Sequence, residues 1–407
     1  MIYLWKPLQL RLLSHLLASS VLLSAVIAEA APVYVQAGPG SFNHAALDLL
    51  ADRNAETFQR LYSGTPDNTY ATAAENNAWA FSALANSTIE GQLVPAIVNA
   101  MRNYRVIELK ASVHMPIEMC VFGLNNTSKI THAASHPAAL KQINRWLSVH
   151  QIKTKPVPKG TNEAARLLAD GKFNQNTVAI GSCALKAVYP KLTLREVGIQ
   201  DNADNQTLFA LMKLEKRPHK VNVDEARTAL KQVVVQAQTQ INARSDSGKS
   251  VFSLIDKRLA QMQSVALFKA NKHKPIEDLS REVVVLSQAL EQARQQCLDT
   301  NSVKAFFQAQ MDAAKAIQYR YRAQWLAEGV PNKTADLTKL RHSLNHLGSA
   351  ILETLTSHLA KHGNLTPELE PVFNAVLVTD NLTGKDKQRL YRALQSVRRV
   401  KNCQATD

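Results

Sequence analysis

The sequence has little of what marks several classes of protein. Its 407 residues include only 14 glycines, 15 prolines and 4 cysteines, with no internal repeat or low-complexity tract, so it is not a fibrous or compositionally biased chain. It contains no run of five lysines or arginines and no zinc-finger or RNA-binding spacing, so the formal charge of +15 does not indicate a nucleic-acid partner. Small polyanions suit this charge better. At 407 residues, of which 45% are hydrophobic, the chain is long enough for two or three domains.

The N-terminal residues have the pattern of an export signal. Lys6 and Arg11 precede an apolar run over 12–27, and the triplet AEA at 28–30 places small side chains where a signal peptidase reads them. We therefore expect residues 1–30 to be a signal peptide and the protein to be periplasmic or secreted. An uncleaved membrane anchor is the alternative, although the run is short for a span. No later segment reaches eighteen apolar residues, so no membrane contact is expected after cleavage.

Four cysteines are compatible with an exported protein, in which disulfides persist. Cys120 and Cys183 lie in one half of the chain, and Cys297 and Cys403 lie in the other. An even number in each half favours the pairs 120–183 and 297–403, although four cysteines allow three connectivities. Cys120 and Cys183 could equally be small buried hydrophobic residues.

The secondary-structure pattern of the sequence changes once along the chain. Between residues 33 and about 216, short β-rich runs such as VYVQA, MCVFGL and VAIGSCAL alternate with helical stretches, which predicts an α/β domain. From residue 224 onward the periodicity is almost entirely helical. We predict an α/β domain over 31–216, a connecting helix or linker over 217–245 with a hinge at the SDSG that follows Arg244, and an all-α helical bundle over 246–407.

Two cations in the helical half have no charge between them, and a third follows just after a proline. Arg258 and Lys269 are eleven residues apart with no charge between them, so we expect them on the same face of one helix. Pro275 should end that helix, and Arg281 should lie one turn inside the next. Cations that converge on the interior of a bundle are costly unless a bound dianion compensates them. Ordinary surface cations are the alternative.

Residues 251–345 resemble the secreted, all-α subclass of chorismate mutase. The matching segments are LIDKRL, ALFKANKHKPIEDLSRE, FFQAQMDAAKAIQYRYRAQW and DLTKLRHSLN. The resemblance implies that four cations bind the two carboxylates and the ether oxygen of chorismate and that one amide faces this oxygen; these residues are Arg258, Lys269, Arg281, Arg341 and Gln318. Ala314 stands where some relatives carry a hydroxyl, so one substrate contact is expected to be missing.

The chemistry of this family matches these residue types. Conversion of chorismate to prephenate is a pericyclic rearrangement that needs no nucleophile, proton transfer or cofactor. The protein must hold the substrate in a compact conformer and stabilise the charge that develops as the ether bond breaks. Fixed cations and a donor amide do both.

The α/β half resembles prephenate dehydratase, which would consume the product of a mutase. The matching segments are GPGSFNHAAL, SHPAALKQ, GTNEAARLL and IQDNADNQTLF. The resemblance implies two α/β lobes, similar to periplasmic binding proteins, with the substrate in the cleft between them. It also implies that Thr207 is the acid for the departing hydroxyl and that five residues bind substrate: Ser41, Asn86, Ser87, Ser135 and Gln142.

Two positions depart from the dehydratase pattern. Leu208 stands where the family has an arginine after the threonine, and Ala85 stands where it has the glutamate of a Glu-Asn pair. We expect each loss to remove a few kcal/mol of binding or transition-state stabilisation.

Three hypotheses about function follow. The first is an exported bifunctional enzyme of phenylalanine biosynthesis, in the shikimate pathway, which converts chorismate through prephenate to phenylpyruvate without a cofactor or metal. In the second, only the mutase is active, and the α/β part is a degenerate dehydratase that binds a ligand or partner. The third is a non-catalytic periplasmic solute-binding protein with a helical appendage, against which the four cations and Gln318 argue. A homodimer is compatible with all three.

We predict that the mature protein begins at Ala31, because the signal peptidase should cut after the small residue at position 30. N-terminal sequencing of protein isolated from the producing cell should read Ala31-Pro32-Val33. Retention of Met1, or recovery of the protein from the cytosol, would contradict the prediction.

Overall fold

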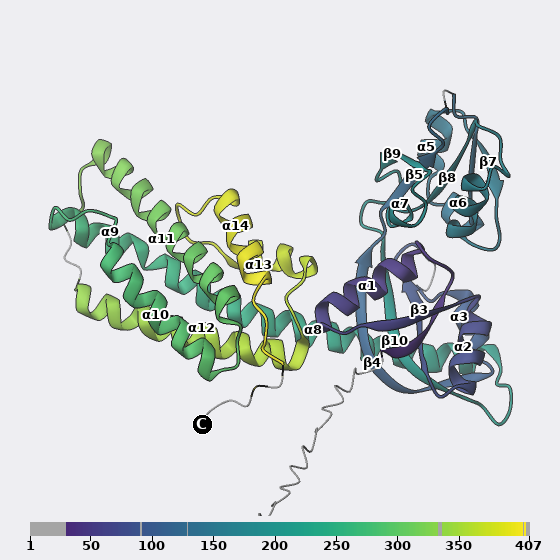
Figure 1. Ribbon diagram of the computed structural model, residues 1–407, viewed down its shortest axis with the longest axis horizontal. Coiled ribbons are helices and arrows are strands. Elements are labelled where there is room, and N and C mark those ends of the chain that lie inside the picture. The colour runs from purple at the N-terminus through teal and green to yellow at the C-terminus, as the bar shows by residue number, and fades with distance from the viewer. Residues whose placement is uncertain (1–29, 90–91, 128, 333–335, 402, 404–407) are drawn as a thin grey trace, which may run out of the picture.

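The computed structural model describes residues 30–407 except 90–91, 128, 333–335, 402 and 404–407. The expected export signal therefore lies outside the described residues, apart from Ala30. Two regions of different architecture follow one another along the chain, a pair of α/β lobes and a bundle of long helices (Figure 1). The α/β fold and the all-α fold predicted from the sequence are both confirmed.

The first lobe is built on a five-stranded sheet. In spatial order its strands are β2 (Phe58–Gly64), β1 (Ala31–Gln36), β3 (Trp79–Asn86), β10 (Gln206–Lys216) and β4 (Tyr104–Pro116). Strand β1 is parallel to β2 and β3, whereas β10 is antiparallel to both of its neighbours. Helices α1 (Phe42–Asn54), α2 (Pro66–Glu75) and α3 (Pro95–Ala100) belong to this lobe. Thr65 caps α2, and Pro66 occupies its first turn, a combination that favours helix initiation.

The second lobe has its own five-stranded sheet. Its strands, in spatial order, are β7 (Lys153–Pro156), β6 (His132–Ser135), β8 (Thr177–Ser182), β5 (Met119–Gly123) and β9 (Thr193–Val197). Its helices are α4 (Pro137–Leu140), α5 (Asn144–Val149), α6 (Thr161–Ala169) and α7 (Leu185–Val188). Every residue of β8 is buried, as expected for a strand covered on both faces. The chain passes between the lobes twice, from β4 to β5 and from β9 to β10, where Ile117 N–H bonds the Asn205 carbonyl.

The helical region surrounds one hydrophobic core. Its elements are α8 (Val223–Ala260), α9 (Met262–Asn271), α10 (Leu279–Gln295), α11 (Thr300–Glu328), α12 (Leu337–His362), η1 (Pro367–Leu369), α13 (Glu370–Val376) and α14 (Gly384–Gln395). Aromatic side chains pack edge to face in this core, including Phe252 against Phe373 and Tyr391. Such pairs stabilise a core beyond the area that they bury.

The hinge expected after Arg244 is absent. Helix α8 runs without a break over 38 residues, about 57 Å. Gly248 does not loosen it, because a Cβ built there would lie 3.3 Å from Leu369 and 3.5 Å from the Phe252 ring, so this glycine lies in a packed contact. Ser247 bonds His358 of α12. Tertiary packing thus overrides the local turn preference of the SDSG segment.

A second difference concerns Arg258 and Lys269, which lie on two helices rather than one. Helix α8 ends at Ala260, and α9 begins at Met262. Gln261 between them keeps right-handed helical angles, with φ −71° and ψ −10°, and its side chain donates to Ser343. Helix α9 then ends at Asn271, four residues before Pro275.

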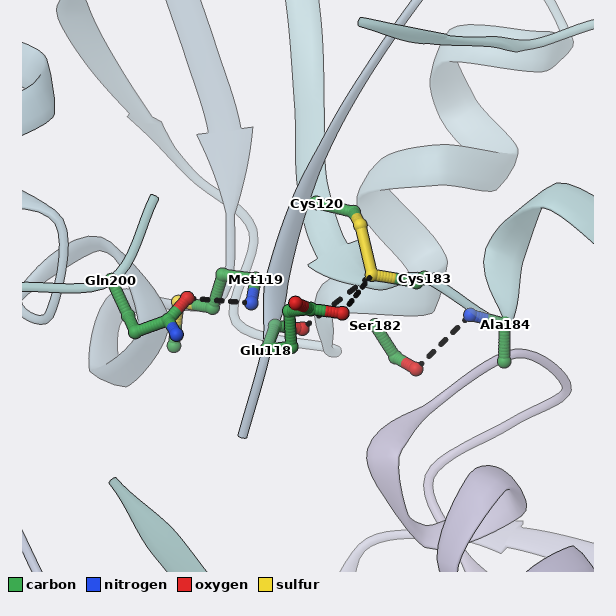
Figure 2. The surroundings of a disulfide bond; sticks show 7 residues. All are labelled: Glu118, Met119, Cys120, Ser182, Cys183, Ala184 and Gln200. Atoms are coloured by element: carbon green, nitrogen blue, oxygen red, sulfur yellow. Dashed lines mark hydrogen bonds between the residues drawn. A yellow bond between two sulfur atoms is a disulfide. The ribbon is translucent and has the colours of Figure 1, made fainter. Parts of the chain in front are cut away.

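Both disulfides favoured by the sequence are present. Cys120 of β5 bonds Cys183, which follows β8, and Figure 2 shows Glu118 beside this bond. Cys297, in the connection between α10 and α11, bonds Cys403 near the C-terminus. Across the described ranges, no helix combines the length and apolarity that a membrane span requires.

Candidate functional sites

One cavity in the helical bundle gathers all five of the mutase residues predicted from the sequence. It has a volume of about 290 Å³ and lies among α8, α9, α10, α11 and α12. Its lining includes Arg258, Lys269, Arg281, Gln318 and Arg341. Five helices each contribute one of them, so the site forms only when the bundle is assembled.

Arg258 is the most deeply buried charge in this cavity. Its side chain comes from the last turn of α8 and is only 6% exposed. Its Nε and Nη1 atoms have no hydrogen-bond partner. Burial lowers the pKa of its guanidinium to about 10, so the group is still charged at neutral pH. A buried charge without a partner is unfavourable, and an anion in the cavity would compensate it.

The other three cations predicted from the sequence, Lys269, Arg281 and Arg341, have partners within the protein. The half-buried Lys269 donates from Nζ to the Ile276 carbonyl at 2.5 Å. Arg281 donates to Asn345 at 3.0 Å, and Arg341 lies 3.9 Å from the Asp278 carboxylate. Burial lowers the pKa of Lys269, whereas the nearby Asp278, Glu282 and Glu277 carboxylates oppose this shift. These cations are held in place but remain accessible from the cavity.

Gln318 presents an amide from the middle of α11. Its Nε2 donates to the Ala314 carbonyl one turn earlier, at 3.1 Å, and lies 3.5 Å from the sulfur of Met262. Its Oε1 is buried without a partner. The methyl group of Ala314 lines the same cavity, so this position offers no hydroxyl.

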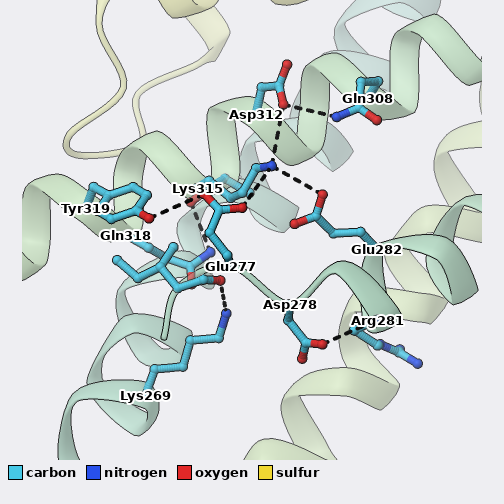
Figure 3. A network of polar contacts seen from close by, with 12 residues as sticks. Lys269, Glu277, Asp278, Arg281, Glu282, Gln308, Asp312, Lys315, Gln318 and Tyr319 are labelled. Carbon is cyan, nitrogen blue, oxygen red and sulfur yellow. Dashed lines mark hydrogen bonds and ion pairs between the residues drawn. The ribbon is translucent and has the colours of Figure 1, made fainter. Parts of the chain in front are cut away.

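An acidic network along one wall of the cavity was not anticipated from the sequence. Lys315 lies 3.2 Å from Glu282, 3.5 Å from Glu277 and 3.8 Å from Asp312 (Figure 3). These contacts tie the segment between α9 and α10 to α11. That segment carries the Ile276 carbonyl that holds Lys269. The sequence showed Glu277 only as an acid near a helix start, and nothing in the spacing related it to Lys315.

The second candidate site is a cavity of about 820 Å³ between the two lobes. Four of the predicted dehydratase residues line it: Ser41, Asn86, Gln142 and Thr207. Ser135 and Ser87 are not among its lining residues. The Ser135 hydroxyl is fully buried and donates to the Ile180 carbonyl, and the Ser87 hydroxyl accepts from Gln206 N–H. Both hydroxyls therefore stabilise the fold.

A chain of amides connects Thr207 to the opposite lobe. Asn86 Nδ2 donates to the Thr207 hydroxyl at 2.7 Å and to Asn205 Oδ1 at 2.8 Å. Asn205 Nδ2 in turn donates to Gln142 Oε1 at 2.6 Å. Because the Thr207 oxygen accepts this bond, its own hydrogen is available to a group in the cavity. Asn205 was not singled out from the sequence, since the segment contains two asparagines and Asn202 only stabilises a turn.

Ser41 stands at the N-terminus of α1, where the glycine-rich turn ends. Its hydroxyl accepts from His44 N–H at 3.2 Å and caps the helix. Gly40 has φ +76°, and a Cβ there would lie 2.8 Å from Leu185 of the second lobe. The turn therefore requires glycine at the point where the lobes approach each other.

Leu208 and Ala85 do not face the cavity, which corrects the expectation that each removes a separate substrate contact. Side chains alternate along a strand, and it is Thr207 and Phe209 that line the cavity. Leu208 is the register partner of Ala85 across β10 and β3, and both are buried in one hydrophobic cluster. An arginine and a glutamate at these two positions would be neighbours, and in this chain the two positions form an apolar pair.

We therefore predict strong coupling between the two positions. Leu208→Arg alone should destabilise the chain by about 3–5 kcal/mol, because it buries an unpaired charge. Ala85→Glu alone should also destabilise it, whereas the double variant should recover at least about 1 kcal/mol of the summed loss. Denaturant unfolding of the four proteins measures this coupling, with Leu208→Met as the volume-matched control. Unchanged stability of Leu208→Arg together with faster prephenate turnover would contradict the assignment.

Comparisons with known proteins match the two parts of the chain to different families. The family profile for prephenate dehydratase matches residues 33–217, and that for chorismate mutase type II matches residues 249–319. A monofunctional chorismate mutase of Enterobacter agglomerans is 37% identical over 153 residues, which is 37% of this chain and 83% of the relative. A secreted chorismate mutase of Yersinia pestis is 35% identical over 146 residues, which is 36% of this chain and 78% of the relative.

Solved structures match each half separately. The crystal structure of the Yersinia pestis secreted chorismate mutase has 34% identity and a TM-score of 0.35, over 37% of this chain and 97% of that one. The prephenate dehydratase of Arthrobacter aurescens in complex with L-Phe has 22% identity and a TM-score of 0.37, over 47% of this chain and 61% of that one.

The protein is thus an enzyme with an isomerase-type and a lyase-type domain. The chain belongs to the chorismate mutase family, and it carries a prephenate dehydratase domain ahead of the mutase domain.

Proposed function

We propose that the chain is an exported bifunctional enzyme that converts chorismate to prephenate in the bundle and prephenate to phenylpyruvate between the lobes. The observation that carries the proposal is the burial of Arg258 without a partner in a cavity that Lys269, Arg281 and Arg341 also line. A cavity of about 290 Å³ is at the lower end of the range for small-molecule sites. A compact dicarboxylate suits both its size and its charge.

In the mutase step, the cations act by position and charge. Arg258, together with Arg281 and Arg341, would bind the two carboxylates and hold the substrate in the compact conformer. Lys269 and the Gln318 amide would face the ether oxygen, on which negative charge develops as the C–O bond breaks and the new C–C bond forms. Preorganised donors stabilise such charge without reorganisation during the reaction.

In the dehydratase step, prephenate loses carbon dioxide and its ring hydroxyl. The electrons of the breaking C–C bond would complete the aromatic ring and expel the hydroxyl, which takes a proton and leaves as water. Thr207 would donate to this hydroxyl, and Asn86 would orient the threonine through the bond described above. Asn205 would hold the side chains of Asn86 and Gln142 in position through its hydrogen bonds to both.

The proposed domain limits follow the two activities, with the dehydratase over 31–216 and the mutase over 246–407. Export is supported by the N-terminal pattern and by relatives that are named secreted chorismate mutases. The second candidate function keeps only the mutase active, with the lobes as a ligand-binding module. It is favoured by the use of the Ser87 and Ser135 hydroxyls in internal bonds.

The mutase site is tested by Gln318→Glu. A neutral amide donates at any pH, so wild-type kcat/KM on chorismate should be nearly flat between about pH 5 and 8. Burial lowers the pKa of Lys269. Any decrease in wild-type kcat/KM should therefore occur at alkaline pH, where this lysine loses its charge. Gln318→Glu should be active in acid and lose at least about tenfold as its carboxyl ionises.

The exposed Gln308 lies on the same helix and supplies the control. Gln308→Glu should leave the pH profile of kcat/KM unchanged. If Gln318→Glu had the wild-type profile, Gln318 would not face the ether oxygen and the proposed site would fail.

The dehydratase site is tested by Thr207→Ala. Purified protein supplied with prephenate should form phenylpyruvate, and the variant should lose at least about a hundredfold in kcat, in the range expected for removal of a general acid. Thr207→Ser, which keeps the hydroxyl, should retain much of the activity, and mutase turnover should be unaffected in both variants. Absence of phenylpyruvate with the wild-type protein would establish the mutase-only alternative, and full activity of Thr207→Ala would reject the role of Thr207.

A further inference from the structure

A second positively charged cavity lies where the α/β domain meets the helical bundle. It has a volume of about 500 Å³, and both domains contribute to its lining. The end of α1 and strand β4 contribute from the first lobe, the C-terminal end of α12 contributes from the bundle, and the middle of α8 lies between them. It shares no lining residue with either candidate active site.

Two arginines of this cavity are buried. Arg53 and Arg244 are each 6% exposed, and the Nε atom of each has no hydrogen-bond partner. Arg244 has an ion partner, Glu368 at 2.9 Å, and it also donates to the carbonyl of Asn364 and the hydroxyl of Thr366. Arg53 donates to the Ser112 carbonyl at 2.8 Å. Among the described residues, no carboxylate lies within ion-pair distance of Arg53.

The remaining charges do not balance Arg53. Glu56 lines the cavity but already pairs with Lys110 at 3.0 Å. Lys361 and His362 add donors from the end of α12. Burial and the neighbouring charge of Arg244 lower the pKa of Arg53 to about 10, against the effect of Glu368, so Arg53 is charged at neutral pH. The wall therefore has an excess of positive charge beside the buried guanidinium of Arg53, which has no carboxylate partner among the described residues.

Aliphatic groups form another part of the wall. Ala111, Ile241, Ala243, Leu359 and Ala360 line the cavity together with the cations. We propose that this cavity binds a small carboxylate with an apolar body, its anionic group on Arg53 and Lys361 and its body against Ile241 and Leu359. The proposal is independent of the two proposed activities, because none of these residues belongs to either active site.

Occupation of this cavity would link the two domains. The turn after α12 already contacts the end of α1, since Asn364 donates from its backbone N–H to the Arg53 carbonyl at 2.5 Å and from Nδ2 to the Asp52 carbonyl at 2.9 Å. A Cβ on Gly363 would lie 2.5 Å from the Arg53 carbonyl oxygen, so the contact is close. A ligand held by α1 and α12 together would stabilise this docked arrangement.

The test is calorimetric titration of the full mature protein with cyclohexanecarboxylate. Its neutral amide, cyclohexanecarboxamide, and inorganic phosphate serve as comparison ligands. We expect saturable binding of the carboxylate, at least tenfold weaker binding of the amide because it lacks the charge, and at least tenfold weaker binding of phosphate because it lacks the apolar body. Equal binding of the amide or of phosphate would overturn the stated ligand class.

Substitutions inside and outside this cavity test where the carboxylate binds. Arg53→Gln should weaken carboxylate binding at least tenfold, and Lys361→Gln should weaken it about threefold. Lys361 is exposed, so its variant tests the site even if Arg53→Gln fails to fold. Lys304→Gln, an exposed lysine on α11 outside this cavity, is the matched control and should bind as wild type. Undiminished binding by Lys361→Gln, or by Arg53→Gln where this variant folds, would place the ligand elsewhere and reject the proposal.

Discussion

The burial of Arg258 without a counter-charge is the constraint on which the mutase domain depends. A guanidinium in an apolar core is unfavourable, and the surrounding helices do not relieve it, since two of its nitrogens have no partner. The large core formed by α8 to α14 and the disulfide that closes the C-terminal segment supply the stability that tolerates it. The same helices keep the other cations of the cavity engaged but accessible. The site is therefore preorganised for an anion rather than formed around one.

Helix α8 makes the two domains structurally dependent on each other. Its first half packs in the core of the first lobe through Ala226, Leu230, Val233 and Ala237. Its second half packs in the bundle core through Val251, Phe252, Ile255 and Leu259. Arg258, at its end, belongs to the mutase cavity, so a single rigid element extends from the dehydratase domain to the mutase site. The contact of Asn364 with the end of α1 provides a second connection.

The sequence predicted those features that depend on local pattern. Helical periodicity and the prolines indicated the bundle. The five residues of its site came from the resemblance to chorismate mutase, because spacing alone placed Arg258 and Lys269 on one helix, whereas they lie on α8 and α9. The sequence did not predict the continuity of α8. The Ser245–Gly248 segment prefers a turn, and its contacts with Leu369 and His358 override that preference. The pairing of Ala85 with Leu208 and the role of Asn205 depend on register between distant strands. No local signal specifies that register.

The two candidate sites hold their polar groups differently. In the bundle, the charged Arg258 keeps two nitrogens without a partner. Between the lobes, the unpartnered buried atoms are the neutral amide oxygens of Gln36, Asn43 and Asn162, whereas Asn86 and Asn205 bond one another and orient a single hydroxyl. The first arrangement suits a reaction driven by electrostatic stabilisation, and the second suits the placement of one proton donor. The two cavities share no lining residue among the described parts of the chain. Under the proposed function, prephenate formed in the bundle therefore leaves one cavity before it enters the other, and the fusion joins the two steps by proximity rather than through a common site.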